Sequence, residues 1–201
     1  QQRDLRLQRL RVAVLVCIVA IACALIFLRV RESRRLKHLS TTDPLTGVWN
    51  RRYVFEMLGD LLDRTPPERG SVSVLLIDVD DFKVLNDRHG HPVGDAVLVA
   101  LGEALTDMLR PGDVVARVGG EEFMVVLPRC TQDEARGIAE RINERIRELS
   151  VPSDRERARV TASIGVATSA ADCASPEALY AAADAALYQA KDSGKDRAAS
   201  G

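Results

Sequence analysis

The sequence feature that most constrains the fold is a pair of apolar runs within residues 114–127 that meet at Gly119 and Gly120. Runs rich in β-branched residues on either side of a Gly-Gly turn predict a β-hairpin. Glycine also lets a bulky ligand approach the backbone. The adjacent acids Glu121 and Glu122 place carboxylates beside that opening. Two interpretations remain open here: an ordinary hairpin with a solvated acidic turn, or a hairpin that holds an anion through a metal ion.

The net charge of −1 hides an uneven distribution of charged residues. Residues 1–42 hold nine of the 28 Lys/Arg and two of the 29 Asp/Glu, a balance of +7, which leaves −8 for residues 43–201. Because phosphate neutralisation dominates affinity for nucleic acids, an acidic domain is poorly suited to bind them. We therefore expect no nucleic-acid partner, and we expect anionic ligands to arrive together with cations.

Residues 12–28 are seventeen apolar residues without a charge, bracketed by Arg11 and Arg29. At a rise of about 1.5 Å per residue, this length is at the short end of a membrane span. A signal-peptide core and a buried helix are the alternatives, but charged residues follow the run where a cleavage site would need small ones. We predict a transmembrane helix over residues 12–30, preceded by a basic flank over residues 1–11.

The sequence around the predicted span indicates its orientation only slightly. Five Lys/Arg follow the span and four precede it, so the positive-inside rule leans towards a cytoplasmic C-terminal domain. Residues 31–42 are a polar connector, for which a short coiled coil and a solvated linker both remain open. Because the chain begins with Gln1 and not Met, we expect further sequence upstream. The soluble domain is expected over residues 43–201.

Apolar spacing predicts a fixed order of helices and strands in the soluble domain. Helices are expected over residues 50–63, 93–109, 131–149 and 175–191, and strands over 71–77, the two arms of the hairpin, and 160–166. Thr131 and Glu134 have the spacing of a capping box. The core order is β-α-β-β-α-β, the split βαβ or ferredoxin-like, palm-type arrangement. We therefore predict an α/β (α+β) fold with an antiparallel sheet and helices packed on one face.

Acidic residues follow the first predicted strand and are expected to lie next to the hairpin tip. Asp78 and Asp80 are two residues apart, so both can point to one face, with Asp78 beside Glu121. Carboxylates from two strands with a triphosphate between them are the arrangement of metal-assisted phosphoryl transfer, and Mg²⁺ is the expected ion. Asp80 and Asp81 themselves are expected to be solvated, because only one face of a strand end meets the site.

The motifs along residues 43–201 together resemble the GGDEF domain, the family of the diguanylate cyclases. The segments that carry the resemblance are Gly119-Gly120-Glu121-Glu122-Phe123, Asp43-Pro44-Leu45-Thr46-Gly47 with Asn50-Arg51-Arg52, Asp78-x-Asp80-x-Phe82-Lys83-x-x-Asn86-Asp87, Gly90-His91-x-x-Gly94-Asp95, Ser163-Ile164-Gly165, and Ala183-Asp184-x-Ala186-Leu187-Tyr188-x-Ala190-Lys191. They occur in the family's order over about 43–201, which makes the resemblance specific.

The resemblance implies that two copies of the domain form a homodimer and condense two GTP into cyclic di-GMP, releasing two pyrophosphates. It implies that Mg²⁺, or Mn²⁺, is ligated by Asp78, Glu121, Glu122 and the carbonyl of Val79. Glu121 is also the implied base for the 3′-hydroxyl, and Lys83 the second implied catalytic residue. It further implies a bacterial inner-membrane protein, anchored through residues 12–30 with its GGDEF domain in the cytoplasm.

The resemblance also implies which residues contact the substrate. Lys83, Lys191 and Lys195 would neutralise phosphate charge. The implied contacts to the nucleotide otherwise come from Asn86, His91, Asp95 and the backbone of Gly119 and Gly120. A carboxylate that accepts from the N1–H and the exocyclic amine of guanine rejects adenine, which presents an acceptor at N1.

Two further features of the sequence can be compared with the pattern of this family. Arg110 and Asp113 form the RxxD pattern, five residues before Gly119, that the family uses as an inhibitory product site, and Arg141 is expected to contribute to it. Near the C-terminus the family usually has Gly-Arg-Asn, whereas this chain has Gly194-Lys195-Asp196, which loses the guanidinium fork and adds a carboxylate. The alternative to an active cyclase is a non-catalytic module that senses GTP or cyclic di-GMP.

Overall fold

The computed structural model describes residues 41–65, 71–153, 157–169 and 175–200. The basic flank 1–11, the predicted transmembrane segment 12–30 and most of the connector 31–42 lie outside the described residues. Within the described ranges, no helix combines the length and the apolar composition needed to span a membrane. The soluble domain expected from residue 43 is one compact unit that begins at Thr41.

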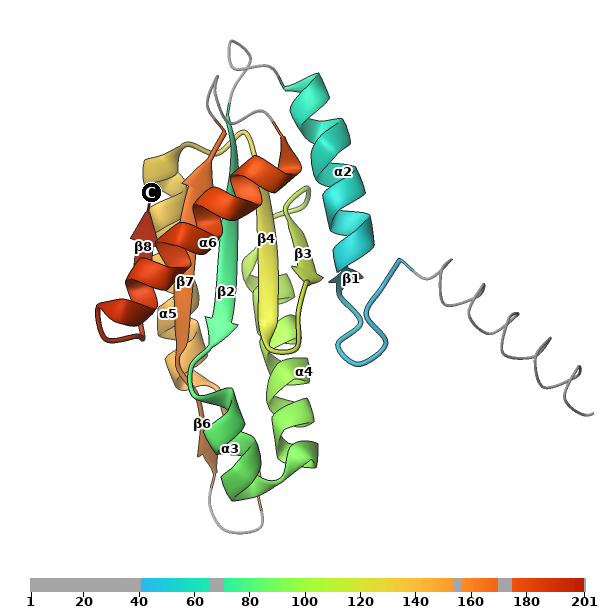
Figure 1. Cartoon of the computed structure of the whole chain (residues 1–201). Helices are drawn as coiled ribbons and strands as arrows, with labels where there is room; N and C mark the ends of the chain where they lie inside the picture. The colour runs from blue at the N-terminus through green and yellow to red at the C-terminus, as the bar shows by residue number, and fades with distance from the viewer. Residues whose placement is uncertain (1–40, 66–70, 154–156, 170–174, 201) are drawn as a thin grey trace, which may run out of the picture. The chain divides into compact units, whose positions relative to one another are not determined.

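A six-stranded sheet in the order β1-β3-β4-β2-β7-β8 is the centre of the domain (Figure 1). Its strands are β1 (Trp49–Asn50), β2 (Val72–Val79), β3 (Val114–Arg117), β4 (Glu122–Pro128), β7 (Ala162–Thr168) and β8 (Ala198–Ser200). The four inner strands pair antiparallel, as predicted, but β1 on β3 and β8 on β7 pair parallel. The prediction of a purely antiparallel sheet is therefore wrong at both edges, and the sheet is mixed.

Helices cover both faces of this sheet, which corrects the prediction that they would pack on one face. On one face, α4 (His91–Met108) and α5 (Gln132–Glu148) pack on Leu75, Ile77 and Val79 of β2. On the other, α2 (Arg51–Arg64) and α6 (Pro176–Asp192) pack on Val74 and Leu76. Figure 1 shows α6 and α2 in front of the sheet and α4 and α5 behind it. Because successive strand residues point to opposite faces, every residue of β2 is buried.

The residues that the sequence predicts as helix N-caps form the expected hydrogen bonds. Thr131 caps α5: its backbone N–H donates to Glu134 Oε2 at 2.8 Å, and its hydroxyl accepts from the Glu134 N–H at 3.4 Å, which confirms the capping box. Ser175 accepts from the Ala178 N–H at 3.1 Å and begins α6.

Besides the edge strands β1 and β8, two further features were not predicted from the sequence. The short helix α3 (Phe82–His89) follows β2 directly, with Phe82 and Leu85 buried at i, i+3 spacing. Strands β5 (Ser150–Val151) and β6 (Ala158–Arg159) form a separate two-stranded sheet. The eight residues of α3 contain only two buried apolar positions, which is too short a pattern to separate a helix from a loop.

Candidate functional site

The end of β2 and the tip of the β3–β4 hairpin lie side by side, as the sequence predicts. Asp78 is directly opposite Glu122 in the antiparallel register. One residue further on, the Val79 N–H donates to the Glu121 carbonyl at 3.4 Å. The strand pairing, which buried side chains on both faces hold in place, therefore fixes the acidic residues of two distant segments at one edge of the sheet.

Asp78 and Glu121 are carboxylates in an environment that opposes their ionisation. Burial raises the pKa of Asp78 above its ordinary 3.8, against the Lys191 ammonium, whose Nζ lies 2.9 Å from Asp78 Oδ1. Burial also raises the pKa of Glu121 above its ordinary 4.5, and the charge of Asp78 adds to this effect. Two carboxylates that disfavour each other's charge are stabilised by a cation placed between them.

These groups fit a magnesium ion that is shared with a substrate. In the part of the chain that the structure describes, no three His, Cys, Asp or Glu side chains come together as a preformed metal cage. Mg²⁺ usually takes one or two protein carboxylates and completes its six ligands with water and substrate phosphates. Asp78, Glu121 and the Val79 carbonyl have this chemistry.

The hairpin tip is held open by its glycines and by one arginine. A Cβ at Gly119 would overlap the Glu122 carboxylate, which lies over that residue, so glycine is needed for this glutamate to keep its position. Arg117 donates through Nη2 to the Gly120 carbonyl at 2.6 Å and through Nη1 to Asp43 Oδ1 at 3.1 Å. The tip is therefore fixed to the segment that enters the domain.

Asp43 accepts the hydrogen bond from Arg117. Burial works to raise its pKa, but hydrogen bonds from the Thr46 side chain and backbone, together with Arg117, hold the pKa below its ordinary 3.8. Asp43 is therefore ionised at neutral pH and accepts a charge-assisted hydrogen bond from a largely buried guanidinium.

Asp80 is not solvated, contrary to the prediction. It is buried and accepts from the Thr161 and Ser163 hydroxyls, at 2.7 Å each, and from the Asp196 backbone N–H at 3.0 Å. Asp81 is exposed, as predicted. The Asp80 carboxylate thus joins the end of β2 to β7 and to the turn after α6. The sequence gives no signal for this role, because all three donors are more than 80 residues away.

The turn after α6 contains Lys195 and Asp196, the two residues at which the sequence differs from the family pattern that it resembles. Lys195 places Nζ 2.6 Å from Asp81 Oδ1, beside the end of β2. Arg147 of α5 holds the Asp196 carboxylate through Nε, at 2.8 and 3.0 Å. The negative charge that Asp196 introduces is therefore paired within the protein.

The predicted base-binding residues lie on α3 and at the start of α4. The Asn86 Oδ1 atom is buried and, within the described residues, has no hydrogen-bond partner. A Cβ at Gly94 would overlap this atom, so glycine is needed for Asn86 to adopt its position. A buried acceptor without a donor is costly unless a ligand supplies one. Three further predicted residues are exposed in the same two helices: Lys83, His91 and Asp95.

The three residues of the predicted product site line one pocket. This pocket has a volume of 510 Å³ and includes Arg110, Asp113 and Arg141. Arg110 Nε lies 3.2 Å from Asp113 Oδ1, and its Nη2 donates to the Pro128 carbonyl at 2.9 Å. The structure therefore brings together a loop residue pair and a helix residue that are about 30 positions apart in the sequence.

Comparison with known proteins agrees with this geometry. The family described as "Diguanylate cyclase, GGDEF domain" matches residues 40–197, which is more than half of the chain. The chain belongs to this family.

Individual relatives and solved structures are similar over the same region. The response regulator PleD of Caulobacter vibrioides is 43% identical over 160 residues, which are 79% of this chain and 35% of PleD. The GGDEF domain of DgcB from Caulobacter crescentus, solved in complex with c-di-GMP, is 28% identical with a TM-score of 0.75, covering 80% of this chain and 92% of that one. The active GGEEF domain of a diguanylate cyclase from Vibrio cholerae is 31% identical with a TM-score of 0.70, covering 75% and 96%. The chain spans only about a third of PleD.

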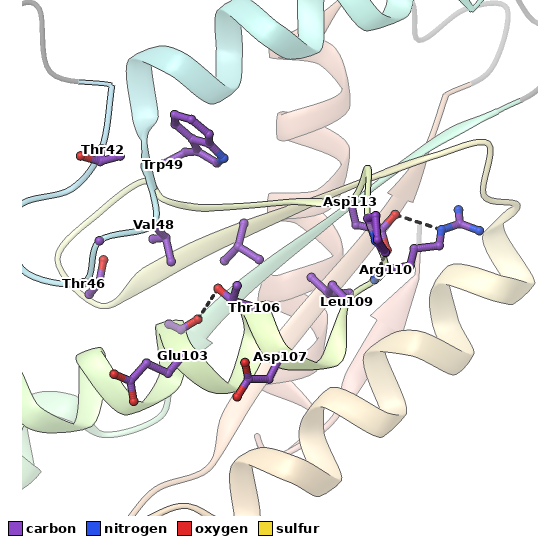
Figure 2. A pocket seen from close by; sticks show the side chains of 14 residues that line it. Thr42, Thr46, Val48, Trp49, Glu103, Thr106, Asp107, Leu109, Arg110 and Asp113 are labelled. Atoms are coloured by element: carbon purple, nitrogen blue, oxygen red, sulfur yellow. Dashed lines mark hydrogen bonds and ion pairs between the residues drawn. The ribbon is translucent and has the colours of Figure 1, made fainter.

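This GGDEF domain has a second, larger pocket that the sequence did not indicate. It has a volume of 840 Å³ and lies between the entering segment, α4 and the start of β3 (Figure 2). Trp49 lines one end, Glu103 and Asp107 of α4 line the floor, and Arg110 with Asp113 lines the other end. Because Arg110 and Asp113 line both pockets, their ion pair forms the wall between them.

Proposed function

We propose that this chain is a membrane-anchored diguanylate cyclase that condenses two GTP into cyclic di-GMP with release of two pyrophosphates. The observation that carries the proposal is the convergence of Asp78, at the end of β2, and Glu121, in the turn before β4, at one edge of the sheet with the Lys191 ammonium. Family membership and the relatives named diguanylate cyclase support it.

In this proposal Asp78, Glu121 and the Val79 carbonyl would hold Mg²⁺, or Mn²⁺, with Glu122 contributing from the start of β4. The ion supplies charge neutralisation at the phosphates and activation of the 3′-hydroxyl. Lys191, which already pairs with Asp78, has the charge and the position to donate to triphosphate oxygens. Lys83 adds positive charge from the start of α3.

Glu121 is the proposed general base. It is a carboxylate at the hairpin tip, beside the end of β2, and can accept the proton of a hydroxyl bound at this edge of the sheet. It takes the proton of a GTP 3′-hydroxyl as that oxygen attacks the α-phosphorus of the second GTP. The bond between the α-phosphorus and the bridging oxygen breaks, and pyrophosphate leaves. Two such steps, one in each direction, close the cyclic product. Because each domain has one such site, the reaction requires a homodimer.

Guanine selectivity is assigned to Asn86 and Asp95. The unpartnered Asn86 Oδ1 is a buried acceptor that a purine N–H donor would satisfy. Guanine presents its N1–H and its exocyclic amine on one edge, and the Asp95 carboxylate accepts from the same edge. Adenine has an acceptor at N1 in place of this N–H donor, so it would set its N1 lone pair against a protein acceptor. The His91 side chain and the backbone of Gly119 and Gly120 complete the proposed nucleotide site.

Product inhibition is assigned to the 510 Å³ pocket. The two guanidinium groups of Arg110 and Arg141 suit a ligand with two phosphates, and Asp113 can accept from a guanine edge. The basic residues around the apolar run support anchoring through residues 12–30 in the bacterial inner membrane, with the GGDEF domain in the cytoplasm.

The test is incubation of the full chain with GTP and Mg²⁺, with nucleotides separated by chromatography and measured against protein concentration. We expect cyclic di-GMP and pyrophosphate in a 1:2 ratio, with specific activity rising as the dimer forms. Absence of product from a dimeric preparation would reject the proposal. In that case, retained binding of cyclic di-GMP by Glu121→Ala would instead identify a sensing module.

A further inference from the structure

The turn after α6 has an unusual backbone conformation that several side chains hold in place. Gly194, Lys195 and Asp196 have φ values of 107°, 60° and 49°. A non-glycine residue with positive φ is uncommon, and two in succession require support from the surrounding structure. The Lys195 N–H donates to the Ala190 carbonyl at 3.1 Å, which closes the end of the helix but does not fix the turn against the sheet.

Two groups fix this turn against the rest of the domain. The first is Asp80, which lies two residues after Asp78. Its buried carboxylate accepts from the Asp196 N–H at 3.0 Å. On the opposite side, Arg147 binds the Asp196 side chain through Nε, at 2.8 and 3.0 Å, and the Asp196 carbonyl through Nη2, at 3.0 Å. A guanidinium that makes three bonds to one residue restrains both its side chain and its backbone.

A second residue of α5 supports the same attachment. Asn143 lies one turn before Arg147 and is buried. With its amide oriented to suit its neighbours, it donates to the Ala162 carbonyl at 3.0 Å and accepts from the Arg197 N–H at 3.3 Å. Residues four apart lie on one face of a helix, so α5 presents both contacts to the tail.

The consequence of this attachment is the position of Lys195. Its Nζ lies 2.6 Å from Asp81 Oδ1, at the end of β2. We propose that Arg147 and Asp196 are positioning residues, which hold the turn so that the Lys195 ammonium stays at the edge where the triphosphate binds. This inference rests on the proposed function. It also explains how the domain accommodates an acid at position 196, because Arg147 neutralises it away from the phosphates.

The test measures binding without turnover. The probe is a GTP analogue with a methylene group between the α- and β-phosphorus, titrated with Mg²⁺ into the full chain by calorimetry. We expect Arg147→Ala to raise the Kd about three- to fivefold, the range of an exposed but multiply bonded ion pair. Asp196→Asn, which keeps the positive φ accessible but loses the charge, should act in the same direction. Arg145→Ala is the matched control, because Arg145 is exposed on α5 and pairs only locally, with Glu148 at 3.2 Å.

A double-mutant cycle separates positioning from general stability. If Arg147 acts through Lys195, then Arg147→Ala should leave the Kd unchanged in a Lys195→Ala background. An equal rise in both backgrounds, or no rise in the wild-type background, would overturn the positioning role while leaving the cyclase proposal intact. A wild-type chain that neither binds the analogue nor converts GTP would reject the proposed function, and the positioning role with it. If Arg147→Ala does not fold, Asp196→Asn takes its place in the cycle.

Discussion

Lys191 at the end of α6 places its ammonium nitrogen 2.9 Å from the Asp78 carboxylate at the end of β2. The lysine supplies the positive charge that a metal ion would bring to the same carboxylate. A metal that bound Asp78 through the same oxygen would compete with this contact, and we expect the released ammonium to turn to phosphate oxygens.

Replacing Lys191 with alanine should have opposite effects on metal and nucleotide. Without the competing ammonium, binding of Mn²⁺ alone should become tighter, as measured by electron paramagnetic resonance. The loss of a charge-assisted contact to phosphate, worth about 1.5–3 kcal/mol, should lower kcat/KM for GTP at least tenfold. Arg145→Ala should change neither quantity. If Mn²⁺ binding weakened in Lys191→Ala, the lysine would not be competing with the metal.

Replacing Glu121 with glutamine should stabilise the domain while it removes turnover. Burial and the Asp78 charge raise the pKa of Glu121, so its ionisation is more costly in the folded state than in the unfolded state. The stability of the wild type therefore falls as pH rises from the ordinary value of 4.5 through the raised pKa. We expect the Tm values of Glu121→Gln and wild type to coincide at pH below 4.5, and the variant to melt higher at pH 7 without metal. A difference that is the same at every pH would contradict the electrostatic cause.

Gly94→Ala should weaken GTP binding although it favours the helix. Alanine is better than glycine in a helix by about 1 kcal/mol, but the added Cβ would overlap Asn86 Oδ1 and displace that side chain. We expect KM for GTP to rise about tenfold, by the loss of one hydrogen bond to the base, with Tm unchanged or higher. Gly59→Ala on α2 is the control, because its Cβ would meet only Pro176, at an ordinary 3.6 Å. An unchanged KM would show that Asn86 does not read the base.

Arg110→Ala and Arg141→Ala should both relieve inhibition by cyclic di-GMP, with different effects on stability. The Asp113 side chain is only 3% exposed, so removing Arg110 leaves a carboxylate with little access to water. We expect Arg110→Ala to lower stability by about 1–2 kcal/mol, whereas the exposed Arg141 should cost less than about 0.5 kcal/mol. Inhibition curves and thermal melts measure the two effects. Arg136→Ala, whose partner Asp133 lies at 4.0 Å on the same exposed surface of α5, is the matched control. Curves for Arg110→Ala and Arg141→Ala that matched wild type would remove the product-site assignment.

The sequence predicted those parts of the fold that depend on neighbouring residues. The capping box of Thr131 and Glu134 was visible because cap and partner are three positions apart. The hairpin was visible because its turn residues and its apolar arms are contiguous. The adjacency of Asp78 and Glu121 followed from the strand order alone, and the register of β2 on β4 confirms it.

The faces covered by helices could not be read in the same way. Residues 72–77 form a short, almost continuous apolar run. Such a run does not show whether helices cover one face of the strand or both faces. The edge strands β1 and β8 have two and three residues, too few for a periodic pattern. Their parallel pairing depends on where the chain enters and leaves the domain.

By itself, then, the sequence determined the family, the identity of the acidic and basic residues at the site, and most of the local elements, because each of these depends on short spacing or on a residue's own chemistry. Only the tertiary structure decided that Asp80 is a buried acceptor, that the Asn86 oxygen has no partner among the described residues, and that Arg147 neutralises Asp196. Each of these properties depends on the surroundings that distant segments provide. The sequence does not distinguish an aspartate in water from one that is buried and surrounded by hydroxyl groups. The free energy of the buried carboxylate depends on those hydrogen-bond donors.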